Sequence, residues 1–134
     1  MTQIWERLFV GSLQDAQRIS QKNLNGIATV ITLCEQCVEG KASDVRYVHL
    51  PIEDDEPVPV RQFNAVMDAI AVSIRTGNVL VHCAVGFSRS PTMAAAYITR
   101  VGFADFDDAL AEIERLRPIT DPSETLLNSV KEYL

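Results

Sequence analysis

The feature that most constrains the fold is an alternation of strand-like and helix-like hydrophobic patterns along the first two thirds of the chain. Helical patterns lie between short apolar, β-branched runs and dominate the last third. This order predicts an α/β domain in which a small, mixed but mostly parallel sheet of four or five strands is flanked by helices. The predicted strands are Leu8–Val10, Ile27–Leu33, Val45–Leu50 and Val79–His82.

Two long helices are predicted by apolar residues at three- and four-residue intervals. The first covers residues 61–75, and Gly77 is expected to end it. The second follows Asp105, a candidate N-cap. It is expected to end with Arg115 and Arg117, whose charges would interact favourably with the negative end of the helix dipole.

Two further helices are predicted from capping patterns. Ser12 followed by Asp15 is typical of a capping box, and this helix is expected to run to about Asn23. In the sequence DPSE, Asp121 is expected to cap the last helix, with Pro122 at its first position.

Composition and charge limit the classes of function. The 134 residues are 47% hydrophobic and 22% charged, which predicts one globular domain over residues 1–134, and this size favours a monomer. No apolar run is long enough to span a bilayer, and the N-terminal sequence MTQIWERLFVG lacks a signal-peptide pattern, so no membrane association and a cytoplasmic location are expected. The net charge of −6 argues against nucleic-acid binding, and any anionic ligand must be attracted by a local site.

The stretch VHCAVGFSRSP, residues 81–91, joins a predicted strand to a predicted helix. Ligands of α/β folds bind at such carboxyl ends of strands. Backbone N–H groups at a helix N-terminus lack internal partners and lie at the positive end of the dipole. The stretch therefore predicts an anion-binding loop, but not the ATP-binding type, whose Gly-Lys-Ser/Thr ending is missing. The loop residues are Ala84, Val85, Gly86, Phe87, Ser88 and Arg89.

Cys83 stands at the mouth of this loop. The positive field of the loop stabilises a thiolate, which is a nucleophile when it faces a bound tetrahedral oxyanion. Arg89 supplies a planar fork of donors for two oxygens of that anion. Phosphoryl transfer needs mainly positioning and charge stabilisation, so the combination predicts phosphoryl chemistry without a metal or cofactor. The alternative is that Cys83 is a buried structural thiol in a tight turn.

Residues 82–83, Gly86 and residues 89–90 match the HC-x-x-G-x-x-R-[ST] signature of the cysteine-dependent protein tyrosine phosphatase superfamily. The fuller VHCAVGFSRSPT resembles the small dual-specificity branch. The resemblance covers nearly the whole chain and includes ERLFVGSLQDA, GIATVITLCE and LRPITDP. It implies the tyrosine phosphatase fold. The chain departs from the usual pattern at Ser123 and Leu126, where the superfamily usually has asparagine and an aromatic residue.

The resemblance also indicates a general acid in the loop that contains Glu53–Glu56. Counting from Tyr47, the superfamily's acid falls on Asp54, with Asp55 as the alternative. Expulsion of an alcohol or phenol requires such a proton donor. Most of this acidic loop is expected to be simply solvated.

The implied mechanism has two steps. Cys83 attacks phosphorus while Asp54 protonates the leaving oxygen, and water then hydrolyses the cysteinyl-phosphate with Asp54 as base. By analogy, the Ser90 hydroxyl stabilises the departing thiolate. His82 is expected to support the loop through hydrogen bonds rather than to transfer protons.

Two other cysteines occur in the sequence LCEQC. Cys34 and Cys37 resemble half a zinc site, but a second pair of ligands is absent, so no metal is expected. In some members of the superfamily a cysteine at the position of Cys34 forms a disulfide with the catalytic cysteine. A resolving partner would protect Cys83 from irreversible oxidation. A buried cysteine at a strand end, without a redox role, is equally compatible with the sequence.

The expected substrate is a phosphorylated protein or peptide, bearing phosphotyrosine and also phosphoserine or phosphothreonine. The chain is too short to build the deep phosphotyrosine pocket of the larger superfamily members. Phosphoinositide phosphatases of the superfamily carry lysines at the variable loop positions, and none of these positions is basic here, so the resemblance disfavours a phosphoinositide. The alternatives are a phosphatase of a phosphoinositide, an RNA 5′ end or a sugar phosphate, and a catalytically weak phosphate-binding module.

Overall fold

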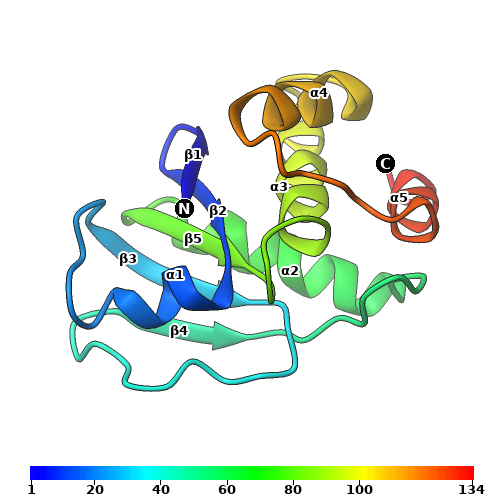
Figure 1. Cartoon of the computed structure of the whole chain (residues 1–134). Coiled ribbons are helices and arrows are strands. Elements are labelled where there is room, and N and C mark those ends of the chain that lie inside the picture. Colours follow the sequence, from blue (N-terminus) through cyan, green and yellow to red (C-terminus); the bar gives the residue numbers. More distant parts are fainter.

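A computed structural model describes residues 1–134 as one five-stranded sheet between helical layers (Figure 1). The strand order is β1-β2-β5-β3-β4; β1 is antiparallel to β2, and the other pairs are parallel. The predicted α/β fold with a mostly parallel sheet is therefore confirmed. The strands are β1 (Thr2–Trp5), β2 (Leu8–Gly11), β3 (Ile27–Thr32), β4 (Arg46–His49) and β5 (Asn78–His82). The helices are α1 (Leu13–Arg18), α2 (Val60–Ser73), α3 (Arg89–Arg100), α4 (Phe106–Leu116) and α5 (Glu124–Lys131).

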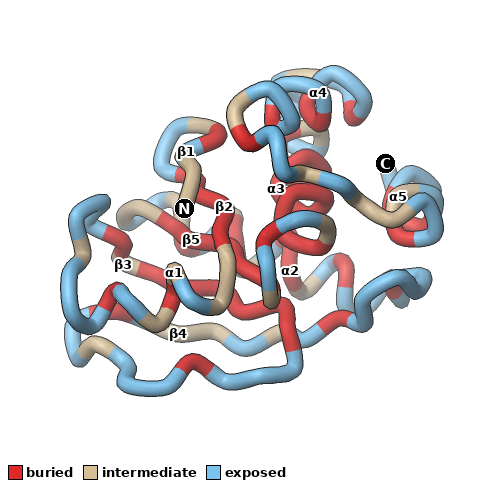
Figure 2. Tube along the Cα trace, viewed as in Figure 1, coloured by how far each residue is buried: buried red, intermediate tan, exposed pale blue.

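Helices cover the two faces of the sheet unequally. Helix α1 and the loop before β4 cover one face with a small core of eight buried residues. The other four helices cover the opposite face, where the main core has 26 buried residues. Burial is concentrated on the central strands and on α3, whereas the outer surfaces of the other helices are exposed (Figure 2). None of the helices is both long enough and apolar enough to cross a membrane.

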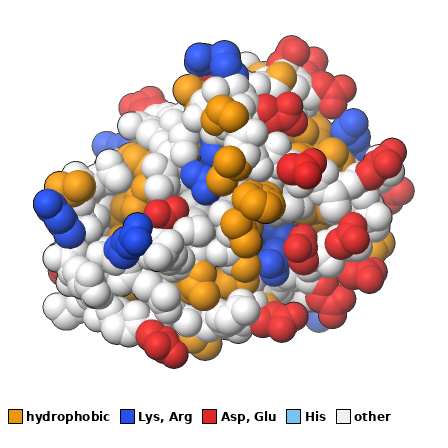
Figure 3. Space-filling model, in the orientation of Figure 1, with side chains coloured by type: hydrophobic (Ala, Val, Ile, Leu, Met, Phe, Trp, Pro, Cys, Tyr) orange, Lys and Arg blue, Asp and Glu red, His pale blue; other side chains and the backbone are white.

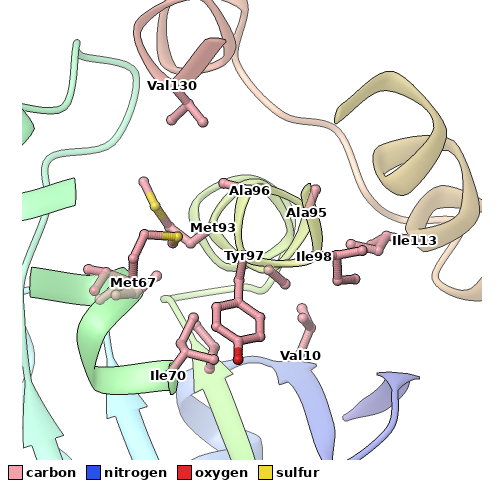
Figure 4. Packing of buried hydrophobic residues seen from close by; sticks show 14 of the residues in the cluster. Val10, Met67, Ile70, Met93, Ala95, Ala96, Tyr97, Ile98, Ile113 and Val130 are labelled. Carbon is pink, nitrogen blue, oxygen red and sulfur yellow. The ribbon is translucent and has the colours of Figure 1, made fainter. Parts of the chain in front are cut away.

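Helix α3 is the central support of the larger layer. Ten of its twelve residues are buried, and residues 94–96 are three consecutive alanines that let neighbouring elements approach closely. Figure 4 shows this helix end-on, with Met67 and Ile70 of α2, Ile113 of α4 and Val130 of α5 around it. Because α3 begins immediately after the loop at 83–88, this packing fixes the position of the predicted anion-binding loop.

Two local predictions hold in detail. Ser12 and Asp15 form both hydrogen bonds of a capping box, and the Asp105 side chain accepts a hydrogen bond from the Asp108 N–H at the start of α4. The four predicted strands all form. The structure adds the edge strand β1, which the sequence did not predict because the four residues TQIW show only a weak alternation of polar and apolar side chains. Strand β1 pairs only with β2.

Four predictions about helix ends are wrong, namely those that concern Asn23, Gly77, Asp121 and Arg117. Helix α1 ends at Arg18 rather than near Asn23, and α2 ends at Ser73. Gly77 is not its C-cap; a Cβ at Gly77 would lie 2.8 Å from the Ala28 Cβ, so the glycine permits close packing against β3.

The last helix is capped by Ser123, whose hydroxyl accepts a hydrogen bond from the Leu126 N–H, and not by Asp121. Arg117 does not complement the dipole of α4 at the surface. Its guanidinium is buried and turns toward the loop at 83–88.

Candidate active site

The predicted anion-binding loop lies at the centre of the sheet, because β5 is flanked by β2 and β3. Cys83 follows the last residue of β5 and is 3% exposed. Its Sγ lies 3.3 Å from the Ser90 hydroxyl in the first turn of α3. Strand packing on both sides holds the cysteine while the loop connects it to the helix N-terminus. The fold therefore places a thiol, a hydroxyl and the positive end of a helix dipole together.

Most carbonyl groups of the loop at 83–88 accept hydrogen bonds from protein groups that lie around the loop. In a trans peptide the C=O of one residue and the N–H of the next point in opposite directions. None of the N–H groups of residues 84–89 donates a hydrogen bond within the protein, so they are available to an anion. The bonded carbonyls are those of Cys83 (to His82 Nδ1), Ala84 (to Leu13 N), Gly86 (to Arg117 Nε), Phe87 (to Asp121 N) and Ser88 (to Thr92 N and Oγ1).

Gly86 is required by both the conformation and the packing of this loop. Its φ of 83° lies in the left-handed region that an L-residue with a side chain resists. A Cβ at this position would lie 2.5 Å from the Arg117 Nη2 and 2.8 Å from the Gly11 carbonyl oxygen. Gly86 therefore lets the loop approach β2 and Arg117 closely.

A hollow of about 350 Å³ opens above Cys83. It is lined by segments from the loop at 83–89, the acidic loop before α2 and the segment before α5. Arg89 is its only basic lining residue, whereas three lining residues are aspartates. Acidic side chains gather on the side of the molecule where α4, α5 and the loop before α2 lie (Figure 3). The lining residues are Asp54, Asp55, Cys83, Ala84, Val85, Phe87, Ser88, Arg89, Asp121, Pro122 and Ser123.

Arg89 connects the anion-binding loop to the acidic loop. Its Nη1 donates a hydrogen bond to the Ile52 carbonyl at 3.1 Å, and its Nε lies 3.9 Å from Asp54 Oδ1. The Arg89 side chain is 10% exposed, whereas that of Asp54 is 57% exposed. Asp55 also lines the hollow, and its φ of 57° places it in a tight turn. The structure thus brings both candidate acids to the hollow, and Asp54 is the one paired with Arg89.

His82 lies beneath the loop, fully buried. Its Nδ1 is 3.0 Å from the Cys83 carbonyl, and its Nε2 is 2.7 Å from the Thr32 hydroxyl on β3. A carbonyl only accepts, so Nδ1 carries the proton and the Thr32 hydroxyl donates to Nε2. Burial lowers the pKa of His82, which favours this neutral ring. The arrangement lets His82 hold the Cys83 peptide without exchanging protons with the hollow.

Cys34 and Cys37 lie beyond the end of β3. Cys34 is fully buried, and burial raises the pKa of its thiol, an effect opposed by the nearby positive charge of Arg89. Cys37 is exposed, with its Sγ 3.7 Å from His49 Nδ1. All three cysteines are free thiols. No three His, Cys, Asp or Glu side chains are grouped so as to hold a metal ion.

Sequence reasoning misses three contributors to the site. The local pattern assigns Arg117 to the helix dipole and Asp121 to a helix cap, and it gives no role to Thr2, whose hydroxyl accepts a hydrogen bond from Arg117. Asp121 lines the hollow and donates its backbone N–H to Phe87. The similarity of the segment LRPITDP to the superfamily is the sequence feature that could have linked Arg117 and Asp121 to the site. Ser123 donates its N–H to the Ser88 hydroxyl, so this departure from the superfamily pattern still supports the loop.

The fold and this loop define the class of protein, and the family comparison agrees. The model of the dual specificity phosphatase catalytic domain matches residues 8–134. The chain therefore belongs to the dual specificity phosphatase family, as the HC-x-x-G-x-x-R-[ST] motif predicted.

Individual relatives are consistent with this assignment. Dual specificity protein phosphatase 15 of Homo sapiens is 30% identical over 128 residues, which are 94% of this chain and 43% of the human protein. A crystal structure of DUSP15 has a TM-score of 0.87 at 30% identity and covers 99% of this chain and 86% of that chain. A crystal structure of human DUSP28 has a TM-score of 0.89, with 99% of this chain and 94% of that chain covered. Its identity of 21% supports the fold alone. The chain spans less than half the length of the human curated relative.

Proposed function

We propose that this domain hydrolyses phosphate monoesters of proteins, phosphotyrosine and also phosphoserine or phosphothreonine, through a cysteinyl-phosphate on Cys83. The observation that carries the proposal is the loop at 84–89, whose N–H groups have no partner within the protein and which lines the hollow above the buried thiol of Cys83. Such a loop binds a tetrahedral dianion and stabilises the thiolate that attacks it.

In the first step the Cys83 thiolate attacks phosphorus, the bond to the leaving oxygen breaks, and Asp54 gives that oxygen a proton. The Arg89 fork holds two of the phosphoryl oxygens, in a direction set by its bond to the Ile52 carbonyl. Asp54 is preferred to Asp55 because it lies 3.9 Å from Arg89 and so faces the same phosphoryl group.

In the second step water attacks the phosphorus of the cysteinyl-phosphate while Asp54 accepts a proton from it. The S–P bond breaks, and the electron pair returns to Cys83. Ser90 stabilises that thiolate, since its hydroxyl lies 3.3 Å from Sγ. Inorganic phosphate leaves, and the site is restored.

The charges of the hollow favour a protein substrate over a polyphosphorylated lipid. Arg89 offers a positive charge to one phosphate group, whereas a second phosphate would meet Asp54, Asp55 or Asp121. Like charges at this range are repelled most strongly where water is partly excluded. Val85 and Phe87 are exposed hydrophobic residues at the same hollow, which suits the side chain of a peptide residue.

Oxidation provides a route to reversible inactivation. Peroxide converts the Cys83 thiolate to a sulfenic acid, and the Cys34 thiol displaces the hydroxyl to form a disulfide and water. Cys34 and Cys83 follow the adjacent parallel strands β3 and β5, and Cys83 is close enough to Cys34 for its charge to contribute to the raised pKa of the Cys34 thiol. A thiol of this kind requires a reducing compartment such as the cytoplasm, and the domain is proposed to act as a monomer.

Hydrolysis of p-nitrophenyl phosphate tests the activity, and phosphopeptides compared with phosphoinositides, 5′-phosphorylated RNA and sugar phosphates test the substrate class. Wild-type protein should hydrolyse the aryl phosphate and the phosphopeptides, and Cys83→Ser should be inactive. Equal activity of the Cys83→Ser variant would refute the mechanism. Higher kcat/KM for a non-protein substrate would refute the substrate class. After mild peroxide, mass spectrometry should find a peptide linked through Cys34 and Cys83, and sulfinic or sulfonic acid at Cys83 alone would exclude the disulfide.

A further inference from the structure

Arg117 is a buried cation on the outer side of the anion-binding loop. It is 8% exposed and follows the last residue of α4. The four ion pairs of the structure involve other cations, and no carboxylate lies within 4 Å of this guanidinium. A buried charge without a counter-ion is unfavourable, and the penalty falls when an anion binds close by.

The hydrogen bonds of Arg117 connect two distant parts of the chain. Its Nε donates to the Gly86 carbonyl at 2.9 Å, and its Nη1 donates to the Thr2 hydroxyl on β1 at 2.9 Å. In the peptide that joins Gly86 to Phe87, the N–H points opposite to the C=O. Because Arg117 holds that carbonyl on the outer side of the loop, it directs the Phe87 N–H toward the hollow.

We infer that Arg117 is a positioning residue for phosphate binding, and that Thr2 anchors it. This inference rests on the function proposed above. The guanidinium fixes one inward N–H and polarises that peptide, so its positive charge is transmitted toward the phosphate and the Cys83 thiolate. Thr2 lies outside residues 8–134, the part matched by the family model. The edge strand β1 therefore contributes to the phosphate site through one hydroxyl.

Three variants separate the parts of this inference. Arg117→Met removes the charge and both hydrogen bonds at similar length, Arg117→Lys keeps the charge without the fork, and Thr2→Val removes only the hydroxyl. Arg115→Met is the matched control, because Arg115 is an exposed arginine of the same helix that pairs with Glu112. Tungstate, a tetrahedral oxyanion, serves as the probe in calorimetric titration, alongside kcat and KM for p-nitrophenyl phosphate and thermal unfolding.

Loss of a charge-assisted hydrogen bond predicts that Arg117→Met binds tungstate about 10- to 100-fold more weakly and loses kcat/KM by a similar factor. Thr2→Val should lose about three- to tenfold in tungstate affinity, with Arg117→Lys between the two variants. Arg115→Met should match wild type in affinity and kinetics.

Wild-type tungstate affinity and kcat/KM in Thr2→Val and Arg117→Lys would overturn the inference, even if their melting temperatures fell, because the role would then be structural only. These two variants keep the test decisive if Arg117→Met does not fold. If wild type binds tungstate but hydrolyses no ester, the proposed function fails while tungstate affinity still tests Arg117. If wild type binds no tungstate, both proposals fail.

Discussion

Gly86→Ala should damage activity far more than its effect on folding would suggest. The left-handed conformation costs a residue with a side chain about 1–2 kcal/mol, partly offset by about 0.4–1 kcal/mol because alanine restricts the unfolded chain. The new Cβ would also lie 2.8 Å from the Gly11 carbonyl oxygen, which is backbone and cannot rotate away. Overpacking of this kind adds about 1–3 kcal/mol. The free energy of unfolding should therefore fall by about 1–5 kcal/mol.

Gly102→Ala is the matched control, since Gly102 has a φ of 81° but no atom beyond its own and its neighbouring residues lies within 4 Å of the place that an alanine methyl would take. It should lose about 1 kcal/mol or less and keep its activity. For Gly86→Ala the peptide displaced by the clash carries an N–H of the phosphate site, so kcat/KM should fall about 100-fold. Urea unfolding and hydrolysis of p-nitrophenyl phosphate measure both quantities. A Gly86→Ala protein with the stability of Gly102→Ala and wild-type kcat/KM would refute the reasoning.

Three further predictions concern residues around the cysteine. Asp54→Asn should lower kcat for p-nitrophenyl phosphate by about 100-fold, while Asp55→Asn changes kcat little; the reverse order would reassign the acid. Ser90→Ala should slow the second step, so a burst of p-nitrophenol should precede slow turnover, and single-phase kinetics at the wild-type rate would exclude this role. Because burial lowers the pKa of His82, its contribution to stability is complete above the unfolded pKa of about 6.5 and is lost as the pH falls toward the lower folded pKa. Its share of the slope is at most about 1.4 kcal/mol per pH unit, so the free energy of unfolding in urea should depend less steeply on pH in His82→Gln than in wild type; the same pH dependence in both proteins would contradict the assignment.

Sequence patterns predicted the parts of the fold that depend on local periodicity. The strands of the parallel sheet and helix α2 have strong apolar patterns, and the capping box at Ser12 satisfies its backbone groups locally. Strand β1 pairs with the neighbouring strand β2, and Thr2 also accepts a hydrogen bond from Arg117, which lies at the far end of the sequence. A pattern of neighbouring residues cannot predict a contact between residues that are far apart in the sequence.

The same distinction applies to the site. The motif around Cys83 and Arg89 predicted the loop, because its residues are adjacent in the chain. Arg117 and Asp121 lie on a segment whose role is set by where it packs. Asp121 has the features of a helix cap, yet its backbone N–H is used by the Phe87 carbonyl and Ser123 caps the helix instead. Tertiary hydrogen bonds here override a local preference of similar strength.

The most direct test of the account is rapid-quench mass spectrometry during turnover of a phosphotyrosine peptide. A phosphoryl adduct on Cys83 should form and decay at rates consistent with kcat, and it should accumulate in the Ser90→Ala variant. If turnover proceeds with no adduct on Cys83, or with the phosphoryl group on another residue, the proposed chemistry is contradicted.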